Sequence, residues 1–247
     1  GKEMGDMFKG NEAIAEAAIR AGARLYAGYP ITPSTEIMEH MSWRMAEVGG
    51  TFIQAESEIA GINMIIGGAA CGVRSITASS GPGISLKQEG MTTLSDEQLP
   101  AVVVNMVRYG NGIGTLLSAQ CDYLRETRGG GNGDYRCIVL CPDSIQEAVD
   151  LTVLAFDLAE KYYKLGIENK DSYAPRNLAT LYEEQEKFDL AENSCSSIFH
   201  AFGSVKIDEK VQKNKFSSCF MFLNHERVRQ NYLHGTSIEI RQIFCHF

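Results

Sequence analysis

The chain has 247 residues, with 31 acidic against 23 basic side chains and a net charge of −8. This negative charge argues against nucleic acid or an anionic membrane surface as a partner. No run of 18 apolar residues and no N-terminal hydrophobic signal core occur, so we expect a soluble, cytoplasmic protein. Seven cysteines without framework or iron–sulfur spacing favour reduced thiols, and we expect no metal site in this chain.

Helical and strand patterns alternate along the first two thirds of the chain. The expected helices cover residues 11–22, 34–48, 57–72, 85–94 and 144–162. The expected strands cover residues 24–29, 51–54, 74–79, 101–107 and 137–140, and we expect them to be apolar throughout. Such alternation is typical of a parallel sheet with helices on both faces, because strands buried on both sides read as continuous apolar runs. The predicted fold class is therefore α/β.

The composition changes near residue 162. Residues 1–162 contain 21 of the 24 glycines, and residues 163–247 contain three. We therefore predict an α/β domain over 1–162 and a mainly helical or irregular C-terminal segment over 163–247.

Two glutamates stand where the strand over 51–54 gives way to a helix, in the sequence QAESEIAG of residues 54–61. Glu58 falls in the first turn of that helix, where its side chain can face a cleft at the sheet edge. Acidic residues also favour helix N-termini for purely structural reasons. Both interpretations of Glu56 and Glu58 stay open on spacing alone.

Three further turns follow predicted strands. In residues 28–34 (GYPITPS) two prolines stiffen the turn that carries the Thr32 hydroxyl, which suits either an anionic ligand or a simple helix cap. Residues 79–85 (SSGPGIS) allow a ligand to approach the backbone closely, or only a tight turn. Arg108 follows the strand over 101–107 and either clamps a carboxylate or is a surface arginine.

These turns together offer a carboxylate, a hydroxyl and an arginine on one edge of the sheet. They include no nucleophile with a base and no complete phosphate cradle. Residues 109–134 add a long glycine-rich stretch that predicts a functional loop or a partner surface. We therefore expect half of a site, with another chain supplying the rest.

Several segments resemble the α subunit of 2-oxoacid:ferredoxin oxidoreductases, particularly those acting on 2-ketoisovalerate (3-methyl-2-oxobutanoate). The resemblance covers residues 9–162 in order and is carried by GNEAIAEAAIRAG, GYPITPSTE, FIQAESEIAG, SSGPGISLKQEG and SIQEAVDLTVLAFDLAEKY. It implies a pyrimidine-binding domain for thiamine diphosphate. It also implies oxidative decarboxylation of a branched-chain 2-oxoacid to an acyl-CoA, with ferredoxin as the electron acceptor.

The resemblance also implies which groups lie elsewhere. A β subunit would carry the diphosphate- and Mg²⁺-binding half of the site, because no G-D-G motif with a suitably spaced Asn occurs here. The iron–sulfur clusters would belong to another subunit, in agreement with the cysteine pattern. The implied small molecules are a 2-oxoacid and coenzyme A.

Site residues follow from the same resemblance. Glu58 would share a proton with N1′ of the cofactor's pyrimidine ring, and Glu56 is the fallback. Thr32 and Arg108 would contact the substrate's carbonyl and carboxylate. The remaining residues expected to bind the cofactor are Tyr29, Pro30, Ile31, Ser80 and Gly81.

The C-terminal region departs from this family. Residues 159–193 resemble tetratricopeptide repeat material, and a fusion there would leave the sheet one strand short. The alternative function is a non-catalytic adaptor, in which a degenerate α/β domain is joined to helical-repeat material.

Overall fold

One parallel sheet forms the centre of the molecule. The computed structural model describes residues 8–117, 121–133, 135, 137–168 and 219–224. Its strands are β1 (Leu25–Gly28), β2 (Thr51–Gln54), β3 (Ser75–Ser79), β4 (Val102–Val107), β5 (Ile138–Leu140) and β6 (Cys219–Asn224). They run in the order β2-β1-β3-β4-β6-β5, and every pairing is parallel.

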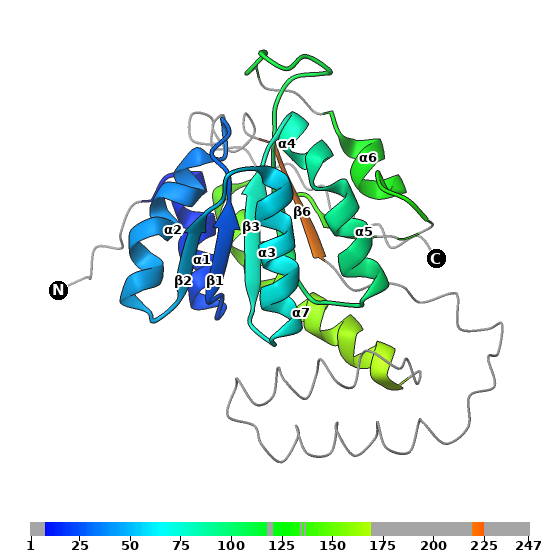
Figure 1. Ribbon diagram of the computed structural model, residues 1–247. Coiled ribbons are helices and arrows are strands. Elements are labelled where there is room, and N and C mark those ends of the chain that lie inside the picture. Colours follow the sequence, from blue (N-terminus) through cyan, green and yellow to red (C-terminus); the bar gives the residue numbers. More distant parts are fainter. Residues whose placement is uncertain (1–7, 118–120, 134, 136, 169–218, 225–247) are drawn as a thin grey trace.

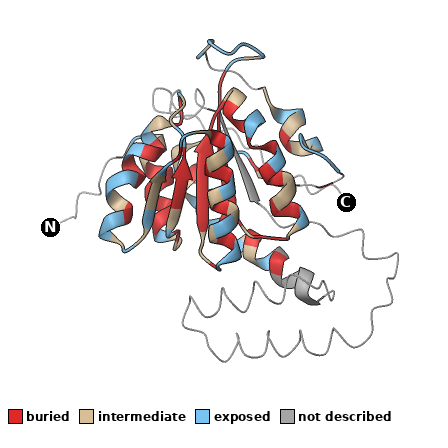
Figure 2. Ribbon diagram, viewed as in Figure 1, coloured by how far each residue is buried: buried red, intermediate tan, exposed pale blue. Residues whose placement is uncertain are grey.

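Helices cover both faces of this sheet (Figure 1). On one face α1 (Gly10–Arg20), α2 (Thr35–Glu47) and α7 (Ile145–Glu168) share one apolar core. On the other face α3 (Glu58–Ala70), α4 (Gly81–Leu86) and α5 (Gln88–Asp96) enclose a second core. The short helix α6 (Tyr123–Arg128) lies beyond α4. Figure 2 shows the central strands buried and the outer surfaces of the helices exposed. The predicted α/β class is confirmed.

The strands differ from the expected apolar runs at several positions. β2, at the edge of the sheet, has exposed Thr51 and Gln54 at its ends. β3 reads Ser-Ile-Thr-Ala-Ser, and all five residues are buried. Because side chains alternate across a strand, Ser75, Thr77 and Ser79 share one face. Thr77 accepts a hydrogen bond there from Lys87, which lies between α4 and α5. A row of hydroxyls is therefore built into the buried centre of the sheet on the α3–α5 side.

Three features of the structure differ from the sequence-based expectations. The single helix expected over 85–94 is two helices, α4 and α5, which adjoin at Lys87. The stretch expected to be irregular over 109–134 contains α6. A sheet one strand short is wrong, because β6 occupies the place between β4 and β5.

The C-terminal region is described only in part. α7 runs past residue 162 to Glu168, and Tyr163 is buried, so no element ends at the expected boundary. The segment that resembles tetratricopeptide repeats lies outside the described residues from 169 onward. The division into 1–162 and 163–247 stays a prediction. In the described residues no helix combines the length and apolarity that crossing a membrane requires.

A buried carboxylate joins α1 to α2. Glu16 is 6% exposed and accepts hydrogen bonds from Arg44 Nε and Nη2 at 3.0 Å each, from Arg20 Nε at 3.0 Å and from His40 Nε2 at 3.2 Å. The bonds from Arg44, aided by Arg20 and His40 and opposed by burial, lower the pKa of Glu16 to about 2. An ionised carboxylate with several charged donors is a strong interhelical contact.

We predict that Glu16→Gln lowers the free energy of unfolding at pH 7 by about 2 kcal/mol, because charge-assisted hydrogen bonds are lost. The contribution should be complete above about pH 4.5 and disappear as the pH falls through about 2, since the folded-state pKa is depressed. Urea denaturation at pH 7 and over a series that extends down to about pH 2 measures both. Glu39→Gln, on the exposed side of α2, should change stability by less than about 0.5 kcal/mol. Equal losses of unfolding free energy for the two variants would contradict the stabilising role of the buried Glu16 carboxylate.

Candidate functional site

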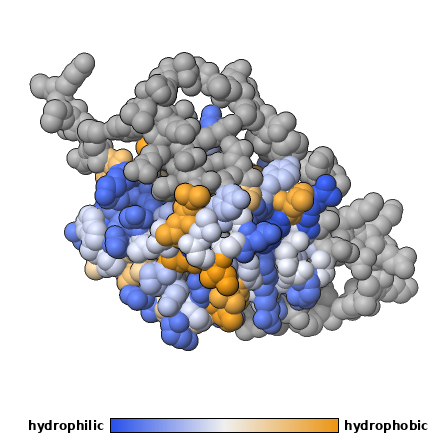
Figure 3. All heavy atoms as spheres, turned by 90° about the horizontal axis from the view of Figure 1, so that it is seen from above, coloured by the Kyte–Doolittle hydropathy of each residue, from blue (hydrophilic) through white to orange (hydrophobic). Residues whose placement is uncertain are grey.

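The turns singled out in the sequence meet at one edge of the sheet. Because all strands are parallel, their carboxyl ends lie on the same side, and Figure 3 looks onto that side. A strip of hydrophobic side chains runs between hydrophilic ones in this view. The turn over 28–34 follows β1, Glu58 follows β2, the turn over 79–85 follows β3 and Arg108 follows β4.

Glu58 is the first residue of α3. Ser57 precedes it in an extended conformation and caps the helix, with its Oγ accepting a hydrogen bond from the Ala60 amide at 3.2 Å. The Glu58 side chain is only 6% exposed, whereas Glu56 two residues earlier is exposed. Among the described residues, no hydrogen bond reaches the Glu58 carboxylate. A buried carboxylate with acceptors to spare is ready to take a donor from a ligand.

Gly83 makes room for this carboxylate. A Cβ at residue 83 would overlap Ser79 Oγ and would lie 2.7 Å from Glu58 Oε1. The backbone of α4 therefore approaches the carboxylate and the end of β3 more closely than any other residue type allows. The turn over 79–85 was predicted from the sequence with Ser80 and Gly81 as its cofactor-binding residues, whereas Ser79 and Gly83 of the same turn were not named as site residues.

Three buried polar atoms around this turn have no hydrogen-bond partner in the described part of the chain. They are Ser79 Oγ, Ser80 Oγ and Arg108 Nε. Gly81 lies at φ +45°, and a Cβ there would be 2.9 Å from Arg108 Nε. Buried polar groups are normally satisfied, so a cluster of unsatisfied ones indicates a missing ligand or partner. The turn over 79–83 thus separates Glu58 from Arg108 and presents unpaired donors and acceptors.

Arg108 connects the turn after β4 to the turn after β1. Its Nη1 donates to the Thr32 carbonyl at 2.9 Å and its Nη2 to the Ile113 carbonyl at 2.8 Å. The side chain is buried rather than superficial, at 6% exposure. Since both terminal nitrogens already hold carbonyls, Arg108 braces the site, and a carboxylate ligand would use their second N–H groups or Nε.

The turn over 28–34 presents its hydroxyl and its aromatic ring to solvent. Thr32 is exposed and Tyr29 is 39% exposed, while Pro30 and Ile31 are partly buried. The Ser34 hydroxyl donates to the Ile31 carbonyl at 2.8 Å and does not cap α2. A turn closed by its own hydrogen bond holds Thr32 next to Arg108 with its side chain accessible.

Lys87 lies behind Glu58 and was not among the predicted site residues. It is fully buried at the junction of α4 and α5, and its Nζ donates to Thr77 Oγ1 at 3.0 Å and to the Glu58 carbonyl at 3.4 Å. Burial lowers the pKa of Lys87 to about 8, and the negative charge of Glu58 opposes that shift. The sequence signal, a lysine within SLKQEG, could not show that this side chain points inward.

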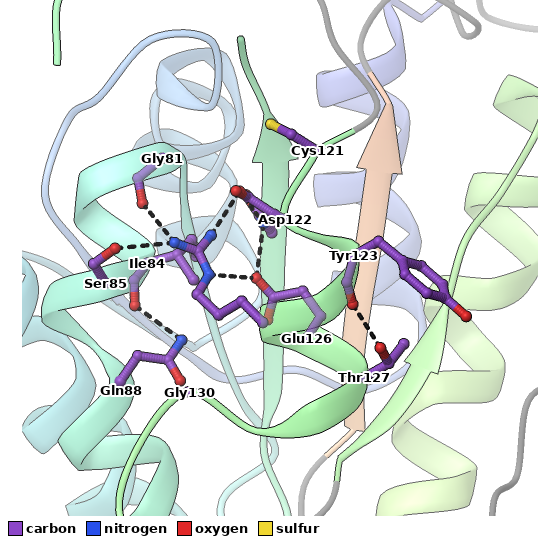
Figure 4. A network of polar contacts seen from close by, with 12 residues as sticks. Gly81, Ile84, Ser85, Gln88, Cys121, Asp122, Tyr123, Glu126, Thr127 and Gly130 are labelled. Carbon is purple, nitrogen blue, oxygen red and sulfur yellow. Dashed lines mark hydrogen bonds and ion pairs between the residues drawn. The ribbon is translucent and has the colours of Figure 1, made fainter. Parts of the chain in front are cut away.

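A second polar cluster fixes α6 against the same turn (Figure 4). Arg125 donates to the Gly81 carbonyl at 3.3 Å, to Ser85 Oγ at 2.9 Å, to Asp122 Oδ2 at 2.6 Å and to Glu126 Oε1 at 3.0 Å. The guanidinium therefore ties the loop before α6 to the turn after β3. Sequence analysis missed this contact because its partners lie some 40 residues apart in the chain.

The glycine run that follows α6 packs on α5. The amides of Gly130 and Gly131 donate to the Tyr135 hydroxyl, which donates in turn to Gln88 Oε1 at 3.1 Å. A Cβ at residue 131 would overlap Thr92 Oγ1 and lie 2.8 Å from the Gln88 carbonyl. Close backbone approach, rather than loop freedom alone, explains why glycines occur here.

A metal ion would need side chains of the described residues that could together bind it. Across the described ranges of the chain, no group of three or more His, Cys, Asp or Glu side chains could hold one. A ligand at this edge would therefore meet hydroxyls, an arginine and one buried carboxylate from this chain.

Comparisons with known proteins identify the family of the chain. Residues 16–175 match the family model described as "Pyruvate flavodoxin/ferredoxin oxidoreductase, thiamine diP-bdg". The ketoisovalerate oxidoreductase subunit VorB of Methanothermobacter marburgensis is 53% identical over 156 residues, which are 63% of this chain and 44% of the relative. The 2-oxoglutarate synthase subunit KorA of Methanocaldococcus jannaschii is 45% identical over 157 residues, which are 64% of this chain and 43% of the relative.

A solved structure shares the fold. The 2-oxoglutarate:ferredoxin oxidoreductase from Magnetococcus marinus, solved with 2-oxoglutarate, coenzyme A and succinyl-CoA bound, matches with a TM-score of 0.59 and 33% identity. The match covers 61% of this chain and 26% of that one. The chain thus spans less than half the length of these relatives.

We predict that Gly83→Ala lowers the free energy of unfolding by about 1–3 kcal/mol, because a methyl group there displaces Ser79 or Glu58. Gly67→Ala is the matched control. Gly67 lies inside α3, and an added Cβ there would meet nothing within 4 Å. Alanine at residue 67 should therefore raise the free energy of unfolding by about 0.5–1 kcal/mol. Urea denaturation at pH 7 compares the two. A stabilising Gly83→Ala would show that α4 does not press on the carboxylate.

Glu126 is a second buried carboxyl group whose protonation affects stability. It is 2% exposed, and its Oε1 accepts from Asn105 Nδ2 at 3.1 Å and from Arg125, while its Oε2 has no partner in the described residues. Burial raises the pKa of Glu126 to about 7, with Arg125 opposing the shift. The folded protein therefore binds this proton more tightly than the unfolded chain does. The resulting stabilisation is complete below about pH 4.5 and is lost as the pH rises through about 7.

Glutamine at residue 126 mimics the protonated acid. We therefore expect the free energy of unfolding of Glu126→Gln, relative to that of the unmodified chain, to increase by roughly 1–3 kcal/mol between pH 5 and pH 8. Chemical denaturation at several pH values measures the difference. Glu89→Gln, on the exposed side of α5, should show no such trend. A difference that is constant with pH would mean that Glu126 is ionised throughout.

Proposed function

The chain belongs to the thiamine-diphosphate-binding family of pyruvate flavodoxin/ferredoxin oxidoreductases, and on this premise we propose that it is the pyrimidine-binding α subunit of a 2-oxoacid:ferredoxin oxidoreductase. The observation that carries the proposal is the buried carboxylate of Glu58, which lies at the carboxyl edge of the sheet with no hydrogen bond from the described residues. Unpaired Ser79, Ser80 and Arg108 Nε lie around the adjoining turn.

The residues of this edge fit the pyrimidine end of thiamine diphosphate. Glu58 would share a proton with N1′ of the ring, because its buried carboxyl group has no hydrogen-bond partner in the described residues. Ser80 and Gly81 would flank the ring, with Tyr29, Pro30 and Ile31 on the other side. When bound, the cofactor supplies a thiazolium that attacks the 2-oxo carbon and stores the electrons released on decarboxylation.

The contribution of this chain is to hold and move one proton. A buried carboxyl group can give up or take a proton with little reorganisation of water, and general acid–base catalysis of this kind contributes on the order of 10²–10⁴ in rate. Ser57 fixes the position of Glu58 by capping α3, and Gly83 closes the backbone around it. Glu56 is exposed, which leaves Glu58 as the preferred group.

The substrate we propose is a branched-chain 2-oxoacid. The relatives named above include one ketoisovalerate oxidoreductase subunit and one 2-oxoglutarate synthase subunit, and the identity is higher to the former, 53% against 45%. Thr32 is exposed and lies next to Arg108, and its hydroxyl would donate a hydrogen bond to the substrate carbonyl. Arg108 would meet the carboxylate through the N–H groups that Thr32 and Ile113 leave free.

Partner subunits would supply the groups that this chain lacks. A β subunit would bring the diphosphate- and Mg²⁺-binding half of the site, and an iron–sulfur subunit would pass electrons to ferredoxin after transfer of the acyl group to coenzyme A. The segment after Arg108 offers a surface for such a partner, since its large apolar side chains are exposed at residues Tyr109, Ile113, Leu116, Leu117, Tyr123 and Leu124. Exposed apolar surface of this extent is typical of protein interfaces.

We predict that Glu58→Gln leaves assembly with the partner subunits intact and lowers turnover on the order of 10²–10⁴-fold, because the proton relay is lost. The chain is co-expressed with matching subunits, the complex is isolated by size exclusion, and viologen reduction is followed with 2-oxoisovalerate and coenzyme A.

Glu56→Gln is the matched control and should keep near-normal turnover, since Glu56 is exposed. If Glu58→Gln retains activity and Glu56→Gln does not, the carboxylate has been assigned wrongly. If the unmodified complex forms but reduces no viologen with any 2-oxoacid, the non-catalytic adaptor becomes the better description.

A further inference from the structure

We propose that Lys87 is a positioning residue whose fixed positive charge, buried behind Glu58, sets how readily the Glu58 carboxylate exchanges its proton with the pyrimidine ring of the cofactor. The inference rests on the proposed function and extends it to a residue that neither the sequence motifs nor the comparisons assign.

The ammonium of Lys87 has no structural ion pair. Among the described residues, no carboxylate lies within ion-pairing distance of Nζ, which instead donates to Thr77 Oγ1 and to the Glu58 carbonyl. The whole side chain is inaccessible to solvent. Burying a charged group without a partner costs stability, and proteins tolerate such costs mainly where function needs them.

The packing brings this charge to the start of α3. A Cβ at Gly61, one turn after Glu58, would lie 3.4 Å from Nζ and 3.3 Å from Gly28 Cα. The glycine therefore lets α3 lie against β1 with the ammonium beneath its first turn. The amine reaches the same residue whose carboxylate faces Gly83 on the other side.

Charged side chains of both signs lie on the elements around Glu58. Lys87 acts from the α4–α5 junction and Arg108 from the end of β4, whereas Arg125 on α6 is already paired with Asp122 and Glu126. β1 and β3 contribute no charged side chain, and the exposed Glu56 is screened by water. Because Lys87 is buried, its interaction with Glu58 is screened least.

The charge is present at working pH. Burial lowers the pKa of Lys87 to about 8, so the amine is still mostly protonated at pH 7. An adjacent positive charge favours the ionised form of a carboxylate. Lys87 would thus keep Glu58 ready to accept a proton and return it, without itself touching the cofactor.

The test compares Lys87→Met with the unmodified chain. Methionine matches lysine in length and suits a buried site. The carboxyl carbon of Glu58 is observed by NMR in the full chain labelled with ¹³C-glutamate, and Glu58→Gln assigns its resonance. We expect this resonance to change at a higher pH in Lys87→Met than in the unmodified chain, because an adjacent positive charge favours the ionised form of a carboxylate.

Two further variants separate the effect of the Lys87 charge from general charge removal and from the loss of hydrogen bonds. Lys161→Met removes the same charge from an exposed position on α7 and should leave the Glu58 resonance unchanged. Lys87→Gln keeps a donor for Thr77 and the Glu58 carbonyl while removing the charge. It should behave as Lys87→Met does, and it replaces that variant if circular dichroism shows that methionine disrupts the fold.

A second measurement uses the complex with its partner subunits, thiamine diphosphate and Mg²⁺. The pH at which the near-ultraviolet circular dichroism of the bound pyrimidine changes should move in the same direction as the carboxyl resonance. An unchanged carboxyl resonance overturns the role of Lys87, whether or not the cofactor binds. A shifted carboxyl resonance with an unchanged cofactor signal overturns instead the contact between Glu58 and the cofactor.

Discussion

The burial of one carboxylate in the first turn of α3 is the constraint around which the carboxyl edge of the sheet is built. The backbone of α4 approaches the Glu58 carboxylate because residue 83 has no side chain, and the ammonium of Lys87 donates to the Glu58 backbone carbonyl. Charged groups are normally excluded from such positions. The capped helix start, the hydroxyl face of β3 and the break between α4 and α5 all serve to accommodate it.

The same edge is well ordered in its polar contacts but incomplete as a site. Arg108 and Arg125 join turns that follow different strands, so the groups on this edge hold their relative positions without a ligand. Hydroxyls of the β3 turn remain unpaired in the described residues, and apolar side chains after Arg108 face outward. An organised half-site with an exposed apolar rim is what a cofactor shared between two subunits requires.

Much of the fold follows from local patterns. Alternating apolar runs and amphipathic segments located β1 to β5 and the long helices to within a few residues, because burial on both faces imposes that pattern on a parallel sheet. The strand β6 escaped prediction because it lies far beyond β5 in a region without readable alternation, and its place between β4 and β5 depends on pairing across that distance. Two other features departed from the pattern of apolar strands and single helices. β3 carries buried hydroxyl side chains, and the helix expected over 85–94 is divided into α4 and α5.

The sequence by itself determined where the functional turns stand, since Thr32, Glu58, the Ser80–Gly81 turn and Arg108 each follow a strand whose carboxyl end must lie on the common edge. Only the tertiary structure decided which groups surround them. Lys87 meets Glu58 across 29 residues, and Arg108 meets Thr32 across 76. Periodicity reports the local conformation of a segment, whereas the burial of a charge and the approach of two backbones depend on neighbours that are distant in the chain.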